Sequence, residues 1–303
     1  MSQPNLEPSS AAITVVIPAM NESEGIIGTI AEVRTALEGA SIPHVIIVVD
    51  DGSTDGTSER ARSVGVEVIR SERNKGYGAS LKRGIAAART EWIVIIDADG
   101  TYPGSAIPLM IEGRLGAEMV VGARIGADVN IPWERKPAKR VLNLLAEYLS
   151  GIKIPDLNSG LRLFRRRDAL ALETILPSGF SFTTTITLSF ACRDMEIRYV
   201  PIDYRKRKGV SKIRAKHFTQ FMLLIVRLIV LFNPLKVFGP IAFLLFLAGS
   251  AKTAYDIVIG NLSESAVMAI LAGVIIFCVG LLADQNSRLG MSNIAARARR
   301  DST

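Results

Sequence analysis

The sequence reads Trp-Ile-Val-Ile-Ile-Asp-Ala-Asp-Gly-Thr-Tyr-Pro from Trp92 to Pro103, and this stretch decides the fold. Its uninterrupted apolar run is typical of a strand buried on both faces of a parallel sheet. Ligands of open α/β sheets bind outside the carboxyl ends of the strands, so we expect Asp97 and Asp99 at a binding site. Two carboxylates suit Mg²⁺ or Mn²⁺, whose coordination is usually completed by water and substrate phosphates. The alternative is that both aspartates only cap and turn the chain after the strand.

Similar apolar runs occur on both sides of this stretch and alternate with helical patterns. The runs cover residues 13–17, 45–49, 66–69, 118–121 and 197–202, and the helical patterns include residues 26–37, 107–115 and 180–191. Repeated strand and helix at short spacing predicts an α/β fold with a mainly parallel, doubly wound sheet. The first strand-to-helix turn, from Pro18 to Glu22, contains no Gly-x-Gly-x-x-Gly sequence, which argues against a dinucleotide-dependent dehydrogenase.

Polar residues follow several of the other predicted strands. The second strand ends in Asp50-Asp51-Gly-Ser-Thr-Asp55, where we expect Asp55 to cap the next helix. The adjacent pair would gain most if one carboxylate faced a donor such as a nucleotide base. The third strand leads to Asn74-Lys-Gly-Tyr-Gly78, and glycines with a lysine at such a turn either hold a phosphate or form an ordinary loop. Asp156 lies in a turn before a short strand, and the sequence leaves three roles open for it: a helix cap, a sugar ligand or a base.

Apolar residues concentrate near the C-terminus. The composition is 49% hydrophobic with a mean hydropathy of +0.29, which is high for a purely soluble protein. Residues 237–251 carry no charge and their apolar character continues to Ile259, and residues 266–283 form a second uncharged run. Each run is long enough to cross a bilayer as a helix. The apolar residues 218–232 are shorter, so we expect them to form a helix at the membrane interface.

The basic residues indicate an orientation. They flank both apolar runs, whereas residues 260–265 between the runs carry only Glu264, so both flanks are expected on the cytoplasmic side. The net charge of +7 lies largely beside the predicted spans, where anionic lipid headgroups are a nearer partner than nucleic acid. We therefore predict a multi-pass protein of the cell membrane, with a cytoplasmic α/β domain and no nucleic-acid partner.

The predicted organisation has five parts. A cytoplasmic domain covers residues 1–212 and an interfacial helix covers 213–235; transmembrane helices cover 236–259 and 266–283, and a basic cytoplasmic tail covers 284–303. The two cysteines are far apart and one lies within a predicted span, so no disulfide framework is expected. Gly273 and Gly280 in the second span would allow packing against another copy of the chain.

Seven short motifs occur in order along the chain to about Lys212. They are Val16-Ile-Pro-Ala-Met-Asn-Glu22, Val48-Val-Asp-Asp-Gly-Ser-Thr-Asp55, Asn74-Lys-Gly-Tyr-Gly78, Asp97-Ala-Asp-Gly-Thr-Tyr-Pro103, Gly122-Ala-Arg124, Asn158-Ser-Gly160 and Arg207-Lys-Gly-Val-Ser-Lys212. Their order and spacing resemble a family 2 glycosyltransferase of the GT-A fold, specifically the dolichyl- and polyprenyl-phosphate hexosyltransferases. With its paired C-terminal spans, the chain is similar to the bacterial membrane-anchored branch of that family.

The resemblance implies a role for each matching residue. Pro18, Glu22, Asp50, Asp51, Lys75 and Asp97 would contact the nucleotide, and Asp97 and Asp99 would hold Mg²⁺ or Mn²⁺. Arg124, Arg135, Arg207, Ser211 and Lys212 would meet the acceptor phosphate or the donor diphosphate. Catalysis would depend on Asp97, Asp99, Asp156, Arg207 and Lys212. For the basic residues near position 207, the alternative is a signal of membrane topology alone.

The resemblance also implies the reaction. A hexose, glucose or mannose, would move from UDP or GDP to a dolichyl or undecaprenyl phosphate, with inversion at C1. The lipid phosphate is already anionic and needs no strong base, and a divalent ion would neutralise the leaving diphosphate. Two departures from the family pattern matter. Met20 stands where many relatives have an aromatic residue, and Gly100-Thr101 stands where many have leucine and glutamine, which leaves a third metal ligand unassigned.

Two other classes of protein are weighed against this interpretation. A nucleotidyltransferase that makes sugar nucleotides usually has a glycine-rich, basic loop after the first strand, which Pro18 to Glu22 does not provide. A membrane-anchored nucleotide-binding scaffold without activity would not need Asp97, Asp99 and Arg207 together. Both alternatives therefore rank below the hexosyltransferase.

Overall fold

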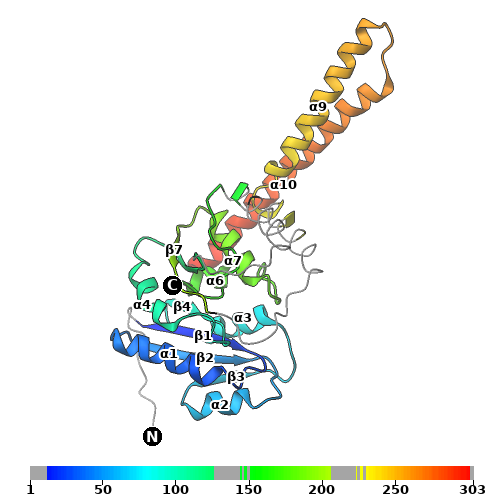
Figure 1. Ribbon diagram of the computed structural model, residues 1–303. Helices are drawn as coiled ribbons and strands as arrows, with labels where there is room; N and C mark the ends of the chain where they lie inside the picture. Colours follow the sequence, from blue (N-terminus) through cyan, green and yellow to red (C-terminus); the bar gives the residue numbers. More distant parts are fainter. Residues whose placement is uncertain are drawn as a thin grey trace. The chain divides into compact units, whose positions relative to one another are not determined.

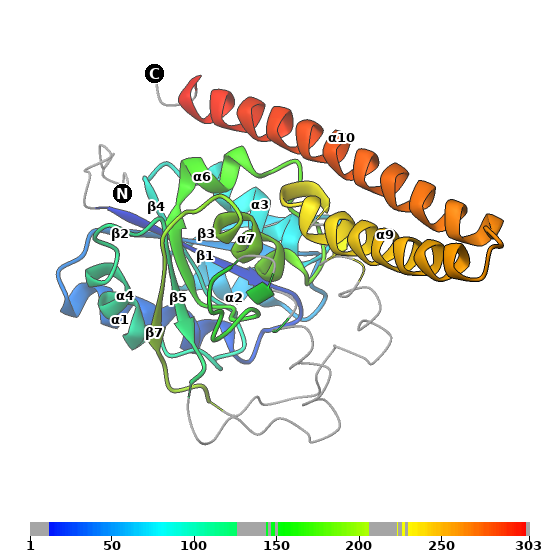
Figure 2. The same cartoon turned by 90° about the horizontal axis from the view of Figure 1, so that it is seen from above.

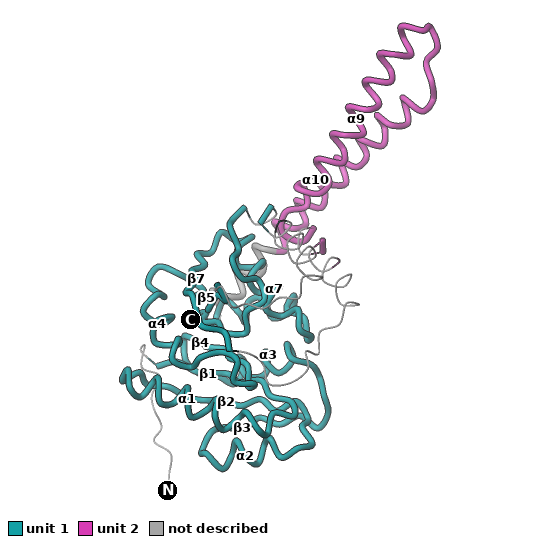
Figure 3. Tube along the Cα trace, in the orientation of Figure 1, with its two compact units in different colours: residues 1–221, 298–303 teal, residues 222–297 magenta. Residues whose placement is uncertain are grey.

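The computed structural model describes residues 12–125, 151–205 and 230–300, together with positions 144, 147–148, 223 and 226–227. The chain divides into two compact units, one formed by Met1–Phe221 with Ala298–Thr303 and the other by Met222–Arg297 (Figure 3). Each unit is described by itself.

The first unit is built on one sheet of seven strands in the order β3-β2-β1-β4-β6-β5-β7. The strands are β1 (Ile13–Ala19), β2 (His44–Asp50), β3 (Glu67–Arg70), β4 (Trp92–Ile95), β5 (Met119–Ala123), β6 (Arg162–Arg165) and β7 (Ile197–Pro201). Strands β3, β2, β1 and β4 are parallel, β6 is antiparallel to both β4 and β5, and β5 is parallel to β7. The predicted mainly parallel α/β sheet is therefore confirmed.

Helices cover both faces of this sheet (Figure 1 and Figure 2). They are α1 (Ile26–Gly39), α2 (Thr57–Ser63), α3 (Tyr77–Ala87), the 3₁₀ helix η1 (Gly104–Ala106), α4 (Ile107–Glu112), α6 (Arg166–Ala171) and α7 (Phe182–Ala191). Helices α1, η1 and α4 contact one another, and α3 contacts α6. This arrangement is the doubly wound packing expected for strands that are apolar on both sides.

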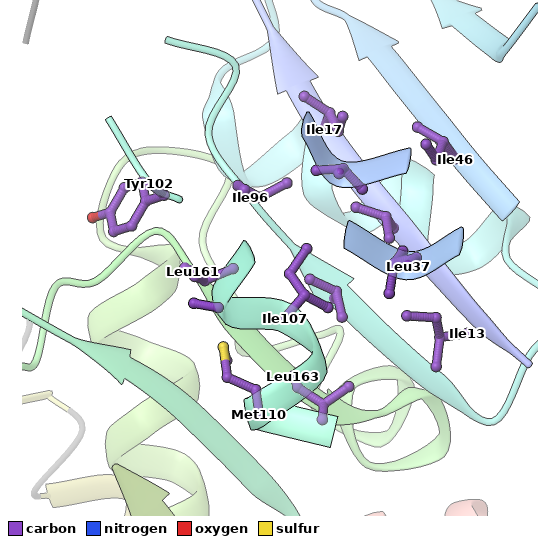
Figure 4. Packing of buried hydrophobic residues seen from close by; sticks show 14 of the residues in the cluster. Ile13, Ile17, Leu37, Ile46, Ile96, Tyr102, Ile107, Met110, Leu161 and Leu163 are labelled. Atoms are coloured by element: carbon purple, nitrogen blue, oxygen red, sulfur yellow. The ribbon is translucent and has the colours of Figure 1, made fainter. Parts of the chain in front are cut away.

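The central strand β1 shows why an unbroken apolar run is needed. All seven of its residues are buried, and successive side chains point to opposite faces. Ile13 and Ile17 belong to the cluster that also contains Leu37 of α1 and Ile107 of α4 (Figure 4). Val16 points the other way, where a Cβ added at Gly84 of α3 would lie only 2.3 Å from it. Gly84 thus lets α3 approach the sheet closely.

Several element boundaries differ by one to three residues from those predicted, and two of them illustrate the differences. Strand β3 lies one residue later than residues 66–69, and the helix expected over residues 107–115 ends at Glu112. Its apolar pattern continues to Leu115, but that side chain is 78% exposed. Gly113 is the C-cap residue, and the turn that follows contains Gly116 with φ +73°, a conformation that other residues rarely adopt.

The second unit contains two long helices, α9 (Leu235–Val258) and α10 (Glu264–Arg300). Residues Leu235–Val258 and Glu264–Gly290 are long and apolar enough to cross a membrane by length and composition. These ranges contain almost all of the two predicted spans. Helix α10 continues through residues 284–300, so no helix end marks the predicted boundary between span and tail. Most of the predicted interfacial helix, residues 213–235, lies outside the described residues.

Glycines of α9 and α10 pack inside this hairpin. A Cβ added at Gly273 would lie 3.0 Å from the carbonyl oxygen of Ala242, and one at Gly280 would lie 2.8 Å from Cβ of Phe238. A Cβ at Gly249 would lie 2.9 Å from the backbone nitrogen of Ile270. The small residues therefore bring the two helices of one chain together. They give no support to the expectation that they pack against a second copy.

Candidate active site

Asp97 and Asp99 follow β4 at the carboxyl edge of the parallel strands. The backbone N–H of Ile96 still donates to the carbonyl of Val16 at 3.2 Å, so Asp97 lies immediately beyond the last β4–β1 contact. Ala98 between them is buried at 3% exposure, whereas both aspartates are half-buried. Thr29 of α1 donates from its hydroxyl to the carbonyl of Ala98 at 3.0 Å. Both carboxylates therefore lie just beyond the carboxyl end of β4, and neither is fully buried.

Residues from distant parts of the sequence contact Asp97. The hydroxyl of Tyr77 donates to Oδ1 of Asp97 at 2.8 Å. Burial and the charge of Asp97 raise the pKa of Tyr77, so the hydroxyl keeps its proton and acts as the donor. On the other side, a Cβ added at Gly160 would lie 2.2 Å from Oδ2 of Asp97. The backbone N–H of Gly160 donates to the hydroxyl of Tyr102 at 2.7 Å, which fixes this close approach.

Asp99 is held by its own turn. Its Oδ1 accepts hydrogen bonds from the backbone N–H of Thr101 at 3.1 Å and from the Thr101 hydroxyl at 2.6 Å. Gly100 between them has φ +70°, which a glycine adopts without strain. Gly100 and Thr101, which depart from the family pattern, therefore shape the turn that orients Asp99.

The residues around this turn fit Mg²⁺ or Mn²⁺. Within the described residues no group of three or more His, Cys, Asp and Glu side chains could hold a metal ion. Two carboxylates are nevertheless enough for an ion that keeps several waters and binds substrate phosphates, which is the usual coordination of Mg²⁺. Asp97 and Asp99 are therefore the pair that would hold a divalent cation.

The loop after β1 is held to the chain after β2 by side chains of the Asp-Gly-Ser-Thr-Asp motif and of Thr57 in α2. The backbone N–H groups of Asn21, Glu22 and Ser23 donate to the Ser53 hydroxyl at 2.9 Å, the Thr57 hydroxyl at 3.0 Å and Asp55 Oδ2 at 3.0 Å, respectively. Pro18, which precedes this loop, is buried in β1 beside Val49 of β2. The predicted nucleotide residues Pro18 and Glu22 are thus positioned by β2 and by the motif that follows it.

Asp55, predicted as a helix cap, precedes the N-cap residue Gly56 of α2 and accepts from the start of the helix. Its Oδ1 accepts a hydrogen bond from the backbone N–H of Thr57, the first residue of α2, at 3.1 Å. Partial burial alone would raise the pKa of Asp55, but the hydrogen bonds from Thr57 and Ser23 lower it to about 2.

The neighbouring carboxylates Asp50 and Asp51 have different partners. Asp50 is fully buried and accepts hydrogen bonds from the Ser53 backbone N–H at 2.9 Å and from the Ser58 hydroxyl. Asp51 accepts hydrogen bonds from the backbone N–H groups of Lys75 and Gly76, both at 2.8 Å. Each carboxylate therefore faces donors, as expected, but these donors belong to the protein. Asp51 joins the end of β2 to the turn that carries the exposed Lys75.

Arg124 and Asp156, predicted separately, form one ion pair. Nε of Arg124 lies 2.6 Å from Asp156 Oδ2, and Nη2 lies 2.7 Å from Oδ1. Burial alone would raise the pKa of Asp156, but the hydrogen bonds and the charge of Arg124 lower it below its ordinary value. Such a carboxylate is a weak base at neutral pH, because a general base works best with a pKa near the operating pH. The Arg124 guanidinium also lies 5.2 Å from the ring of Tyr204.

Arg162 of β6 was not singled out from the sequence. Its side chain is fully buried and donates to the carbonyls of Ser159 at 2.9 Å and Leu157 at 2.8 Å, and to the Thr187 hydroxyl of α7. Arg162 thereby supports the loop from Asp156 to Gly160 that lies against Asp97. The signal that could have found it is an arginine between apolar residues in the run Leu161-Arg-Leu-Phe164.

Four predicted phosphate-binding residues, Arg135, Arg207, Ser211 and Lys212, lie outside the described residues. Arg205 is described, and its backbone N–H donates to the carbonyl of Thr101 at 2.9 Å. Its guanidinium forms a paired contact with Glu32 of α1 at 2.7 and 2.8 Å. The chain that leads toward residue 207 is therefore fixed beside the Asp97–Thr101 turn.

Two family models match the sequence. The model described as Glycosyl transferase family 2 matches residues 14–171, and the one described as GtrB C-terminal hairpin matches residues 233–289. The first range contains all of the described site residues up to Arg162. The second contains α9 and the apolar part of α10 up to residue 289.

Curated proteins and solved structures are also similar. A low-salt glycan biosynthesis hexosyltransferase of Haloferax volcanii is 32% identical over 67% of this chain, which spans half of that protein's length. The dolichyl-phosphate hexose transferase of the same organism is 30% identical, with 66% of this chain and 86% of that protein covered. The crystal structure of glucosyl-3-phosphoglycerate synthase from Mycobacterium tuberculosis, in complex with Mn²⁺, UDP and phosphoglyceric acid, superposes with a TM-score of 0.60. It is 22% identical, with 72% of this chain and 78% of that chain covered.

Proposed function

The chain belongs to glycosyl transferase family 2, and on that premise we propose that it transfers a hexose from a nucleotide sugar to a polyprenyl phosphate at a membrane. The observation that carries the proposal is the Asp97–Thr101 turn. It presents two carboxylates at the carboxyl edge of a parallel sheet, where the GT-A fold binds its sugar nucleotide. The similar dolichyl-phosphate hexose transferase, which uses a lipid phosphate according to its name, supports the acceptor class.

The donor would be UDP- or GDP-hexose. Asp51 and Lys75 border one end of the site and Asp97 and Asp99 the other, and Tyr77 joins the two ends through its contact with Asp97. When bound at Asp97 and Asp99, Mg²⁺ or Mn²⁺ would neutralise the charge that develops on the leaving diphosphate, a contribution of several kcal/mol. The solved relative with bound Mn²⁺ and UDP supports this choice of ion and ligand.

The acceptor chemistry requires little from the protein. The phosphate oxygen of the lipid is anionic at neutral pH and can attack the sugar C1 directly, with the nucleoside diphosphate as the leaving group. Attack from the face opposite the nucleotide would invert the configuration at C1. The need for a catalytic base is therefore small, and Asp156 would serve instead to hold Arg124 in place.

The C-terminal hairpin would supply location. Helices α9 and α10 are long and apolar enough to span a bilayer, and the GtrB C-terminal hairpin model matches them. With basic residues on both outer flanks and Glu264 between the helices, the hairpin would cross twice and leave the catalytic domain at the cytoplasmic face. Lipid phosphate and donor would then meet at the same side of the membrane.

The proposal is tested by reconstituting the full chain in lipid vesicles with polyprenyl phosphate and labelled UDP-glucose, GDP-mannose or other sugar nucleotides. We expect label to enter the organic phase with one donor, and chelation of divalent ions to stop the transfer.

Two substitutions provide the control. Asp97→Asn and Asp99→Asn should each lower transfer by a factor of about a thousand while leaving the melting temperature unchanged, since their charge is needed for the cation. Transfer of wild-type rate in both variants would refute the metal assignment. Formation of sugar nucleotide from sugar phosphate and nucleoside triphosphate would instead support the nucleotidyltransferase. Nucleotide binding with no turnover of any donor would support the scaffold.

A further inference from the structure

Tyr77 connects two parts of the site that are separate in sequence. It is the first residue of α3, and its hydroxyl reaches Asp97 Oδ1 beyond the end of β4. Its ring lies against that of Phe180, with ring centroids 5.8 Å apart and planes inclined by 18°.

The backbone on both sides of Tyr77 is fixed. Asp51 accepts hydrogen bonds from the N–H groups of Lys75 and Gly76. A Cβ at Gly76 would lie 2.4 Å from the carbonyl oxygen of Ser178. Gly78 is equally confined, because a Cβ there would lie 2.2 Å from the carbonyl oxygen of Pro177. The main chain on both sides of Tyr77 is therefore closely packed, and from this position the hydroxyl reaches Asp97.

Asp97 and Asp99 each accept a hydrogen bond from a hydroxyl, but the two hydroxyls come from different parts of the chain. The hydroxyl that holds Asp99 comes from Thr101 in the same turn and is supported by the Thr101 backbone N–H. The hydroxyl that holds Asp97 comes from Tyr77 at the start of helix α3. The backbone at Gly160 also approaches Asp97, since a Cβ there would lie 2.2 Å from Oδ2, and this restricts the carboxylate.

We propose that Tyr77 is a positioning residue, whose hydroxyl orients the Asp97 carboxylate toward the divalent cation and the donor diphosphate. This inference rests on the proposed function, because it requires that Asp97 bind a cation. Hydrogen bonds to a ligating carboxylate fix its rotation, and removal of such an outer partner typically weakens metal affinity by about 10- to 100-fold. Tyr77 would thereby also couple the metal-binding turn to Asp51 at the nucleotide end of the site.

The test uses full-length protein in detergent micelles and measures Mn²⁺ affinity by electron paramagnetic resonance, with UDP or GDP at saturation. Tyr77→Phe keeps the ring that stacks on Phe180 and removes only the hydroxyl. We expect the apparent Kd for Mn²⁺ to rise about 10- to 100-fold, with an unchanged melting temperature and unchanged nucleotide binding in the absence of metal.

The matched control is Tyr199→Phe. Tyr199 lies in β7, and its buried hydroxyl has no hydrogen-bond partner within the part of the chain that the structure describes. Its loss should leave Mn²⁺ affinity at the wild-type value. A Kd for Mn²⁺ in Tyr77→Phe within about twofold of wild type would overturn the inference. Failure of the wild-type protein to bind Mn²⁺ with either nucleotide would overturn the proposed function instead.

A second variant covers the case in which Tyr77→Phe does not fold. Phe180→Leu keeps the tyrosine hydroxyl but removes the stacked ring, which is half exposed in the structure. Because a stacked aromatic pair stabilises the ring orientation, we expect a rise of about two- to tenfold in the Kd for Mn²⁺. An unchanged Kd in this variant would contradict the positioning role.

Discussion

Replacement of Asp156 by Asn should strongly destabilise the catalytic domain. The Asp156 side chain is 2% exposed and the Arg124 side chain 19%, so removal of the negative charge leaves a largely buried guanidinium uncompensated. Breaking a buried pair on one side costs about 3–5 kcal/mol. For a domain of this size that corresponds to a fall of roughly 6–20 °C in melting temperature. The measurement is thermal unfolding of the full chain in detergent, followed by circular dichroism.

The pH dependence of unfolding provides a second signature. The pKa of Asp156 is lowered in the folded protein, so its contribution to stability is fully present above the ordinary carboxyl value of 3.8 and is lost as the pH falls below it. The stability of Asp156→Asn should therefore lack this dependence on acid pH. Combining it with Arg124→Gln should recover about half of the lost stability, because neither member of a neutral pair is then left charged. A melting temperature of Asp156→Asn within about 2 °C of wild type would refute the reasoning.

Three further predictions follow from individual contacts. Gly160→Ala should abolish metal-dependent transfer, because the added Cβ would lie 2.2 Å from Asp97 Oδ2. The control Gly179→Ala, with nothing within 4 Å of its added Cβ, should keep wild-type activity. Equal activities of the two variants would contradict the close approach. Asp55, with its pKa lowered to about 2, should stabilise the loop after β1 above pH 3.8 and lose this contribution as the pH falls toward 2. Hydrogen exchange of the loop, measured between those pH values, should then become faster as the pH falls. Arg207→Gln should lower lipid transfer about thirtyfold to a thousandfold if the residue contacts phosphate in the transition state; unchanged transfer by correctly inserted protein would return it to a topology signal.

The fold was predictable because its main signal is local. Ile13 to Ile17 and Trp92 to Ile96 are apolar on both sides of the strand, and this pattern alone indicates a buried, mostly parallel sheet. The position of β6 between β4 and β5 was not predictable in the same way. Its run Leu161-Arg-Leu-Phe164 carries no information about which strands it joins, since pairing is decided by the packing of the whole domain.

The sequence proposes the residues of the candidate site, but it does not show which residues hold them. Their spacing predicts that Asp97 and Asp99 aim at one point, and the structure places both just after the carboxyl end of β4. The pairing of Arg124 with Asp156 could not be predicted from the sequence, because 32 residues separate them and only the fold brings them together. Tyr77 was missed for the same reason, since its partner Asp97 lies 20 residues away and a tyrosine within a glycine-rich turn is unremarkable in sequence.

The place of β6 in the sheet also determines the order in which the site can be completed during synthesis on the ribosome. Strands β1 to β4 pair with one another and are all contained in residues 13–95, so the half of the domain that would bind the nucleotide can fold early. Strand β5 is made next but does not pair with that half in the finished sheet, because β6 lies between β5 and β4. Gly160, which confines Asp97, arrives together with β6. The metal-binding turn therefore reaches its final shape only after more than half of the chain has emerged.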